Sequence, residues 1–359
     1  MTSTADITFK VLFSFMLSVN FLGNTLVIVV VQRNRRMQTP MNYLLANLAL
    51  ADLLFALFFI PRRLLITEFR HPEGWVGDFL CKTFTHANLS WVASIAAVIT
   101  LLFIAWERYH AIIHPHNSRG RLTKKRLRKI IIFIWISSVI FLLPETWVIR
   151  YDETKRSCIF DFPVWLGKAD SLMWLFAIGL FPLGAMGILY GRVVRRLWFT
   201  GDHVANVSQR TLLKSRKRVT KTVLLITVVL GISWLPNLIY YFLEMWLLIN
   251  DTTMIVTNIG SSETLFRVVS YVLISINSTV NPIIYATQDR AFRRHMWSMV
   301  TKCCRNRNNK VFGDLKESGA CATVSGAAIA LKGFGVECKL AECKLEDAQD
   351  NHLDYCSET

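Results

Sequence analysis

Charged side chains are scarce in this sequence. They make up only 18% of the 359 residues, whereas hydrophobic residues make up 53%. A soluble domain needs roughly a quarter of its residues charged to cover its surface. The composition therefore excludes a pair of ordinary soluble domains, which the length alone would allow. It also means that the formal net charge of +16 is concentrated in a few segments.

Several other features are missing. The eight cysteines include none of the CxxC pairs, with matching His or Cys partners, that a zinc site requires. Residues 1–10 lack a basic segment and a cleavage site, so we expect the first apolar run to serve as its own insertion signal. No metal set or nucleophile–base pair lies among the apolar runs, which argues against an intramembrane enzyme.

Long apolar runs are abundant instead. A helix needs about 20 apolar residues to cross the hydrocarbon core. Seven stretches meet that length, at roughly 9–31, 41–66, 83–106, 130–149, 170–191, 219–248 and 265–286. Several contain a proline or a polar residue, which lipid-spanning helices tolerate when neighbouring helices satisfy the freed groups. The sequence therefore predicts an all-α bundle of seven transmembrane helices.

The basic residues occupy alternate connecting segments. The segments 32–39, 119–129 and 192–221 hold three, seven and nine Lys or Arg residues, with Asp202 as their only acid. The segment 150–170 carries equal numbers of acids and bases. The positive-inside rule then places the N-terminus outside and the C-terminus in the cytosol of a multi-pass membrane protein. Because the basic loops all lie on one side, topology explains them and nucleic-acid binding is not expected.

We expect three parts of the chain. Residues 1–9 form an extracellular N-terminus, residues 10–300 a seven-span domain, and residues 301–359 a mostly disordered cytosolic tail. Within the second part, basic and apolar positions alternate at helical spacing over 289–300, which predicts an amphipathic helix on the inner membrane surface. Cys303 and Cys304 follow it directly and are candidates for palmitoylation, with reduced thiols as the alternative.

A few polar residues lie inside the predicted spans. An ionisable residue at mid-bilayer costs at least about 2.5–3.5 kcal/mol, so Asp52 in the second span requires an explanation. Glu107 and Arg108 lie at the cytosolic end of the third span. A transporter or channel would place a line of ionisable residues through the bilayer, and only Asp52 lies deep.

The positions of short motifs resemble those of the rhodopsin-like (class A) G-protein-coupled receptors over about residues 10–300. The matching motifs are Gly23–Asn24, LAxxD ending at Asp52, ERY at Glu107–Tyr109, Trp135, Pro182 with Tyr190, SWLP at Ser233–Pro236, and NPIIY at Asn281–Tyr285 followed by Phe292. The resemblance implies a receptor that promotes nucleotide exchange on a heterotrimeric G protein and is not itself an enzyme. Arrestin is a further candidate partner, and membrane lipid surrounds the bundle.

This resemblance assigns roles to particular residues. Those expected to couple and switch the receptor are Glu107, Arg108, Tyr109, Tyr190, Trp234, Pro236, Asn281, Pro282 and Tyr285. An internal sodium site would use Asp52, Asn277, Ser278 and Asn281, although Ala97 stands where the family often has a serine ligand. No other cofactor is expected. A disulfide would join Cys81 and Cys158, the two cysteines on the oxidising side.

Two departures from the family pattern matter. Cys81 precedes Arg108 by 27 residues, two more than usual, which predicts an irregular start of the third span. The cytosolic start of the sixth span is basic, so it supplies no acid to hold Arg108.

The sequence also limits the ligand. Ser275 occupies the position of the opsin Schiff-base lysine, and no aspartate stands in the outer third span as in amine receptors. WVGDFLCK (Trp75–Lys82), AxxHP (Ala111–Pro115) and the SWLP and NSTVNPIIYA motifs resemble those of neuropeptide receptors of the neuropeptide Y, neuropeptide FF and orexin kind. Candidate ligand-binding residues are Arg62, Arg63, Ser90, Glu145, Trp165, Glu244, Glu263 and Arg267. These outer charges favour a peptide, and an apolar outer pocket would favour the alternative, a lipid or other small ligand.

Overall fold

The structure is a computed structural model of the whole chain. It describes residues 4–65, 71–115, 122–154, 157–160, 163–199, 207–248, 265–288, 292–296 and 298. The bundle lies within the unit Met1–Thr301. Cys303, Cys304, Glu263 and the predicted tail lie outside the described residues.

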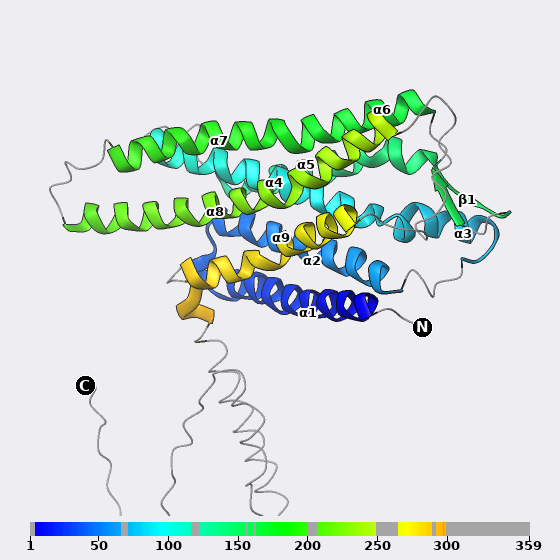
Figure 1. Cartoon of the computed structure of the whole chain (residues 1–359). Coiled ribbons are helices and arrows are strands. Elements are labelled where there is room, and N and C mark those ends of the chain that lie inside the picture. Colours follow the sequence, from blue (N-terminus) through cyan, green and yellow to red (C-terminus); the bar gives the residue numbers. More distant parts are fainter. Residues whose placement is uncertain are drawn as a thin grey trace, which may run out of the picture. The chain divides into compact units, whose positions relative to one another are not determined.

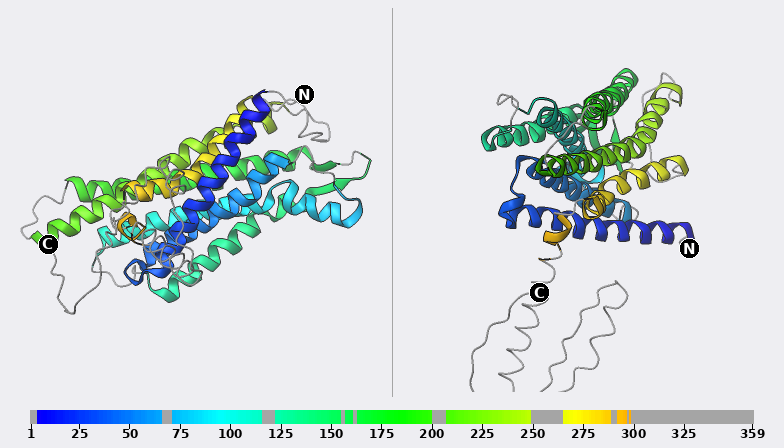
Figure 2. Two further views of the ribbon diagram at one scale, coloured as in Figure 1. Left: turned by 90° about the horizontal axis from the view of Figure 1, so that it is seen from below. Right: turned by 90° about the vertical axis from the view of Figure 1, so that its left-hand side faces the viewer.

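Seven helical segments of the described chain are long and apolar enough to cross a membrane, which confirms the predicted fold class. They are α1 (Thr4–Arg33), α2 (Pro40–Leu65), α4 (Asn88–Ile113), α5 (Lys124–Val148), α6 (Val164–Met173) continuing into α7 (Phe181–Val194), α8 (Val207–Leu243) and α9 (Leu265–Gln288). The helices lie side by side with their long axes roughly aligned (Figures 1 and 2).

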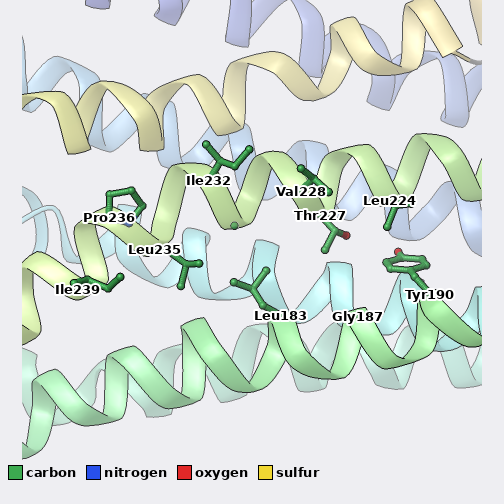
Figure 3. A pocket seen from close by; sticks show the side chains of 11 residues that line it. Leu183, Gly187, Tyr190, Leu224, Thr227, Val228, Ile232, Leu235, Pro236 and Ile239 are labelled. Atoms are coloured by element: carbon green, nitrogen blue, oxygen red, sulfur yellow. The ribbon is translucent and has the colours of Figure 1, made fainter.

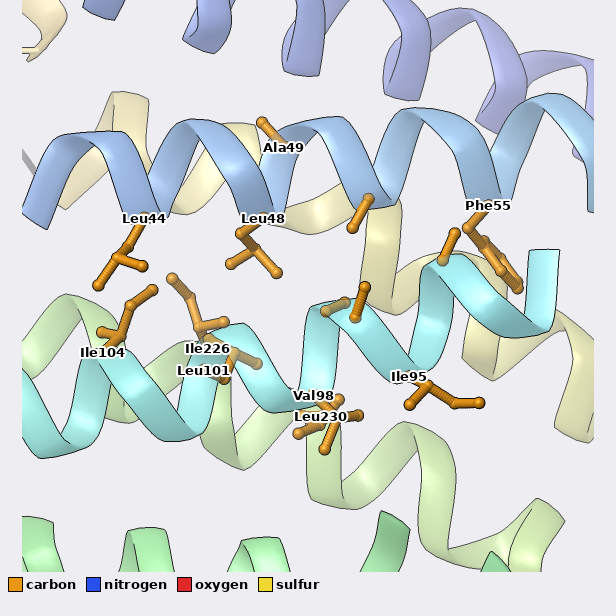
Figure 4. Packing of buried hydrophobic residues seen from close by; sticks show 14 of the residues in the cluster. Leu44, Leu48, Ala49, Phe55, Ile95, Val98, Leu101, Ile104, Ile226 and Leu230 are labelled. Carbon is orange, nitrogen blue, oxygen red and sulfur yellow. The ribbon is translucent and has the colours of Figure 1, made fainter. Parts of the chain in front are cut away.

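The core of the bundle is a continuous apolar cluster in which α2 and α4 face each other. Leu44 and Leu48 of α2 lie opposite Leu101 and Ile104 of α4, and Ile226 of α8 closes the gap between them (Figure 4). The outer faces are apolar as well. On α5, for example, Ile132, Phe133, Ile136 and Ile140 are each about half exposed. A soluble helix would carry charges there, so these faces are suited to lipid contact.

Prolines interrupt five of the spans, and Pro61 is the one inside α2. Pro144, Pro236 and Pro282 lie inside α5, α8 and α9, where each removes a backbone donor and crowds the preceding turn. Pro182 is the second residue of α7, which follows directly on a π-helical stretch, Trp174–Leu180. Such widened turns accommodate the hydrogen bond that a proline cannot make.

The start of the third span is irregular, as its two additional residues predicted. The short helix α3 (Gly74–Leu80) leads into a π-helical turn, Cys81–Thr85, and Ala87 then adopts φ = 60° before α4 begins. The hydroxyl of Ser90 donates to the carbonyl oxygen of Ala87 at 2.6 Å. The wide turn and the left-handed residue together absorb the extra length before the regular helix.

A two-stranded hairpin follows the fourth span, and the sequence analysis did not predict it. Strand β1 (Ile149–Asp152) pairs antiparallel with β2 (Ser157–Phe160), with Tyr151 opposite Cys158. Cys158 forms the predicted disulfide with Cys81, with their Cα atoms 5.6 Å apart. The disulfide therefore attaches the hairpin to the start of the third span.

The WVGDFLCK segment positions this hairpin. A Cβ atom on Gly77 would lie 2.2 Å from the carbonyl oxygen of Pro72 and 3.2 Å from the Tyr151 ring, so the hairpin approaches only because that residue is glycine. Asp78 accepts a hydrogen bond from the Tyr151 amide at 3.2 Å. The start of α1 lies at this end of the bundle, and the end of α9 lies at the opposite end (Figure 1).

Candidate functional site

Glu107 and Arg108 form an ion pair at the end of α4 that lies away from the hairpin. The Nε atom of Arg108 donates to Oε2 of Glu107 at 2.6 Å, and both side chains are about 85% buried. Within the described residues, this is the only ion pair that Arg108 makes. Tyr109, the third residue of the ERY motif, takes no part in this ion pair. It packs against a small apolar cluster of Ile112, Val193 and Leu197.

Two tyrosine hydroxyls are buried in this part of the core, and that of Tyr190 interacts electrostatically with Arg108 and Glu107. The hydroxyl of Tyr285 in α9 has no hydrogen-bond partner in the described structure, and its ring contacts Phe292 at 6.2 Å between centroids. Tyr190 of α7 is only 1% exposed, and its hydroxyl points towards α8 (Figure 3). A buried hydroxyl that lacks a partner costs about 1–3 kcal/mol. A rearrangement that offered the Tyr285 hydroxyl an acceptor would therefore be favoured.

Phe292 begins the segment 292–296, the described part of the predicted surface helix, which is helical. Phe292 is buried, whereas Arg293 and Arg294 are exposed. This division between an apolar and a basic side fits the predicted amphipathic pattern.

The deep carboxylate Asp52 is tied to the seventh span. It is 2% exposed and accepts a hydrogen bond from Nδ2 of Asn281 at 2.7 Å. Asn24 of α1 donates to the carbonyl oxygen of Ser278 at 3.2 Å, so α1, α2 and α9 are held together in one polar region. Next to it, a Cβ atom on Gly23 would lie only 2.7 Å from the Pro282 ring, which explains the glycine of the GN motif.

A small cavity of about 10 Å³ adjoins Asp52, and its wall includes Ser94, Asn277 and Ser278. A cavity of this size holds about one water molecule or ion. The residues supply carboxylate, hydroxyl and amide oxygens, which are the ligands of hard cations, and Oδ1 of Asn277 has no partner in the described structure. The donor set therefore fits a single sodium ion. Asn281 instead uses its amide nitrogen on Asp52.

Ser94 was missed by the sequence analysis. Counting back from Arg108 leads to Ala97, which also lines the cavity but offers no oxygen. Ser94 lies three residues earlier on the same face of α4, where it contributes a hydroxyl to the same cavity. A search one helical turn on either side of the expected position would have found it.

An aromatic chain runs from this region towards the hairpin end. Trp234 of α8 is 4% exposed and meets Trp91 of α4 edge to face, with centroids 6.1 Å apart. Trp91 meets Trp174 of the fifth span in the same way at 6.0 Å. Because edge-to-face pairs are directional, a change in one ring alters the preferred position of the next.

Two carboxylates lie at the end of the aromatic chain that is nearer the hairpin. The Glu145 carboxylate of α5 accepts a hydrogen bond from the Trp174 indole and interacts electrostatically with Asp170 of α6. Asp170 is 5% exposed, and its Oδ2 atom accepts a hydrogen bond from the Tyr241 hydroxyl at 2.8 Å. We call Glu145 and Asp170, with Trp174 and Tyr241, the outer acid site.

Asp170 also escaped the sequence analysis, which counted it among the loop charges. The structure instead buries it at the start of the fifth span, facing α8 through Tyr241. Glu244 lies one helical turn beyond Tyr241 and acts on it electrostatically. The outer acid site therefore joins three spans, and its two carboxylates repel each other whenever both are ionised.

The other ligand-binding candidates lie in different environments. Ser90 is fully buried and bonded to Ala87, whereas Trp165 is 69% exposed at the start of α6. The side chains of Arg62, Arg63 and Arg267 are outside the described part of the structure. Of the eight candidates, the structure thus brings Glu145 and Glu244 near one site, around Tyr241.

Comparison with known proteins identifies one matching family. The family described as "7 transmembrane receptor (rhodopsin family)" matches residues 23–285 of the chain. This match extends from Gly23 of the first span to Tyr285 of the seventh and so includes the ion pair, the Asp52 region and the outer acid site.

Individual relatives are similar over most of their length. The QRFP-like peptide receptor of Branchiostoma floridae is 30% identical over 298 residues, which cover 80% of this chain and 75% of that protein. Galanin receptor type 1 of Rattus norvegicus is 30% identical over 313 residues, covering 86% and 85%. The allatostatin-A receptor of Bombyx mori is 30% identical over 292 residues, covering 79% and 76%.

Proposed function

Because the chain belongs to the rhodopsin family of seven-transmembrane receptors, we propose that it is a plasma-membrane receptor for an extracellular neuropeptide that activates a heterotrimeric G protein. The relatives named above are receptors for peptides. The observation that carries the peptide assignment to this chain is the outer acid site, which suits a basic group of a ligand.

Two independent features support the proposed orientation of the receptor. A disulfide is formed in an oxidising compartment, so the end that holds Cys81–Cys158 faces outside. The basic segments occupy the opposite end, as the positive-inside rule requires of the cytosolic side. The N-terminus is then extracellular and the C-terminus cytosolic.

Recognition begins at the outer acid site. A guanidinium or ammonium group between Glu145 and Asp170 relieves their mutual repulsion and forms charge-assisted hydrogen bonds. It also competes with Trp174 and Tyr241 for the same carboxylate oxygens. An apolar lipid ligand would make neither interaction, which favours the peptide.

The signal then passes through the aromatic chain. Release of Trp174 from Glu145 changes its contact with Trp91, which in turn contacts Trp234 beside the Pro236 kink. In this family the cytosolic half of the sixth span moves outward. Arg108 then leaves Glu107 and contacts the Gα subunit, while the rearranged core offers partners to Tyr285.

A second-messenger assay tests this proposal. Cells that express the chain are challenged with an amidated neuropeptide library, and calcium and cyclic AMP are recorded. Each Arg-containing peptide is paired with an analogue that carries citrulline, the neutral counterpart of arginine. An active peptide should lose its response in Arg108→Ala, although surface expression is retained.

The outer acid site is tested with the same pairs. Asp170→Asn and Glu145→Gln should lower the potency of the arginine peptide about 30-fold or more, with little effect on the citrulline analogue. Glu153→Gln removes an exposed charge from the nearby hairpin and serves as the control. Equal losses for both peptides would contradict charge recognition, and silence of a surface-expressed receptor towards every peptide would favour a lipid ligand.

A further inference from the structure

Two histidines lie one helical turn apart at the end of α4, just after the ERY motif. His110 is in the last turn of the helix, and His114 is its C-terminal cap. The backbone amide of His114 donates to the carbonyl oxygen of His110 at 3.1 Å, so the helical pattern continues through both residues. Their ring centroids are 5.8 Å apart, with an angle of 42° between the ring planes. The two imidazoles therefore lie next to each other on one side of the helix.

Aromatic side chains hold these two imidazoles in place. The Trp106 ring meets the His110 ring with centroids 4.6 Å apart. The Tyr109 ring meets those of His110 and His114 edge to face, at 5.5 and 5.7 Å. Nδ1 of His110 is buried without a hydrogen-bond partner in the described structure, which leaves Nε2 as the nitrogen that can reach a ligand. Because His114 is exposed, the pair is fixed in position and open on one side.

Both the spacing and the distance suit a zinc ion. Two histidines four residues apart on one face of a helix are the zinc-binding pair of the HExxH motif. With tetrahedral angles and Zn–N bonds of about 2.0–2.1 Å, two imidazoles that share a zinc ion have ring centroids about 5 Å apart. A small side-chain rotation closes the difference from the observed 5.8 Å. The helix dipole accounts for a histidine in a last turn, but it does not require a second one at this spacing.

We propose that His110 and His114 bind one zinc ion through their imidazole nitrogens, with water in the remaining positions. Imidazole is a preferred ligand of zinc, whereas harder ions such as magnesium and calcium prefer oxygen. Residues two apart on a helix do not face each other, so the site is separate from Arg108 and its ion pair. The proposal therefore goes beyond the receptor assignment and does not depend on the identity of the extracellular ligand.

Zinc titration of the full-length receptor tests this site. The receptor is purified without a polyhistidine tag, placed in nanodiscs and stripped of metal with a chelator. Zinc should then raise the unfolding midpoint, because a ligand of the folded state stabilises it. Loss of a group that only orients a metal ligand weakens metal binding about 10–100-fold, so His110→Gln and His114→Gln should each weaken zinc binding at least as much. His295→Gln is the control, because His295 has no other histidine within four residues on either side.

A cysteine variant separates metal ligation from a structural role. His114→Cys exchanges one zinc ligand for another and should retain zinc binding. With Co²⁺ in place of zinc, this variant should show an additional thiolate-to-cobalt absorption band. In the absence of metal, His114→Gln should unfold near the midpoint of the wild type, because His114 is exposed.

Three results would overturn the zinc assignment. Zinc affinity that is equal in the wild type and both glutamine variants would place the ion elsewhere. A wild type that binds no zinc would leave the two histidines as partners of the helix dipole alone. Binding that is lost in His114→Gln and not restored in His114→Cys would mean that His114 does not contact the ion. Because the readout is metal binding and not signalling, a failure of the peptide proposal leaves this test unaffected.

Discussion

At the scale of single residues, the positions that tolerate substitution least are those where two backbones or rings come close. Gly23 lies against Pro282, and Gly77 lies against Pro72 and Tyr151. His71 packs beside the disulfide that holds the hairpin. The first contact joins the first and seventh spans, and the others hold the hairpin to the start of the third span.

Gly23→Ala should destabilise the receptor. The new methyl group would lie 2.7 Å from the Pro282 ring, so the helices must separate, and overpacking of this kind costs about 1–3 kcal/mol. Gly184→Ala is the matched control, because no atom lies within 4 Å of its Cβ position. Thermal unfolding in detergent should show a lower midpoint for the first variant only. Equal midpoints would mean that α1 and α9 can move apart freely.

Receptor stability should fall in mild acid because of His71. Its Nε2 atom lies 2.7 Å from Oγ1 of Thr85 and 3.3 Å from Sγ of Cys158, and its ring stacks on Tyr151. Burial lowers the pKa of His71 below 6.5. As the pH falls, His71 of the unfolded chain therefore takes up a proton before His71 of the folded receptor does. The stability that His71 contributes is complete above the ordinary pKa of the unfolded chain. It is lost as the pH falls towards the lowered pKa of the folded receptor.

The measurement is the unfolding midpoint as a function of pH, from about 7.5 to about 5.5. His71→Gln should reduce the slope. His114→Gln removes an exposed histidine and should leave the slope of the wild type unchanged. A slope that is identical in all three proteins would exclude His71 as its source.

At the scale of elements, the irregular turns determine how the spans are oriented. The π-helical turn and the left-handed Ala87 set the rotation of α4, and the π-helical stretch before Pro182 sets that of the fifth span. Trp91 and Trp174 follow these irregularities and meet as a consequence. The aromatic chain therefore depends on backbone geometry as much as on side-chain type.

Ala87→Gly should be tolerated better than the same change in a regular helix. Glycine removes the left-handed strain of about 1–2 kcal/mol, which offsets the loss of a buried methyl group. Ala93→Gly is the control, since Ala93 is equally buried but helical, and it should lose stability. Ala87→Val should reduce surface expression, because a β-branched residue is poorly accommodated at φ = 60°. Equal loss in both glycine variants would argue against strain at Ala87.

At the scale of the whole molecule, the spans meet at Asp52. The cavity beside this carboxylate is lined by residues of α2, α4, α8 and α9. A cation there would interact with groups from several spans at once. Outward movement of α8 would change the cavity, so sodium binding and G-protein coupling are expected to oppose each other.

Sodium should therefore raise the unfolding midpoint relative to an equal concentration of a bulky organic cation. A ligand that binds only the folded receptor stabilises it by mass action. Asp52→Asn should abolish this difference, and Ser94→Ala should reduce it. Ser137→Ala serves as the control, because Ser137 lies on the lipid-facing α5 and away from the cavity. An unchanged sodium effect in Asp52→Asn would place the ion elsewhere.

The sequence by itself determined the number of spans, since seven apolar runs and the composition permit little else. It also determined the disulfide pair and the irregular start of the third span. The tertiary structure alone decided which further polar groups join these sites. Asp170 reads as a loop charge in the sequence, and Ser94 occupies a position that counting does not reach. Both are brought into place by π-helical turns and by the crossing of helices, and these depend on contacts between residues far apart in the chain.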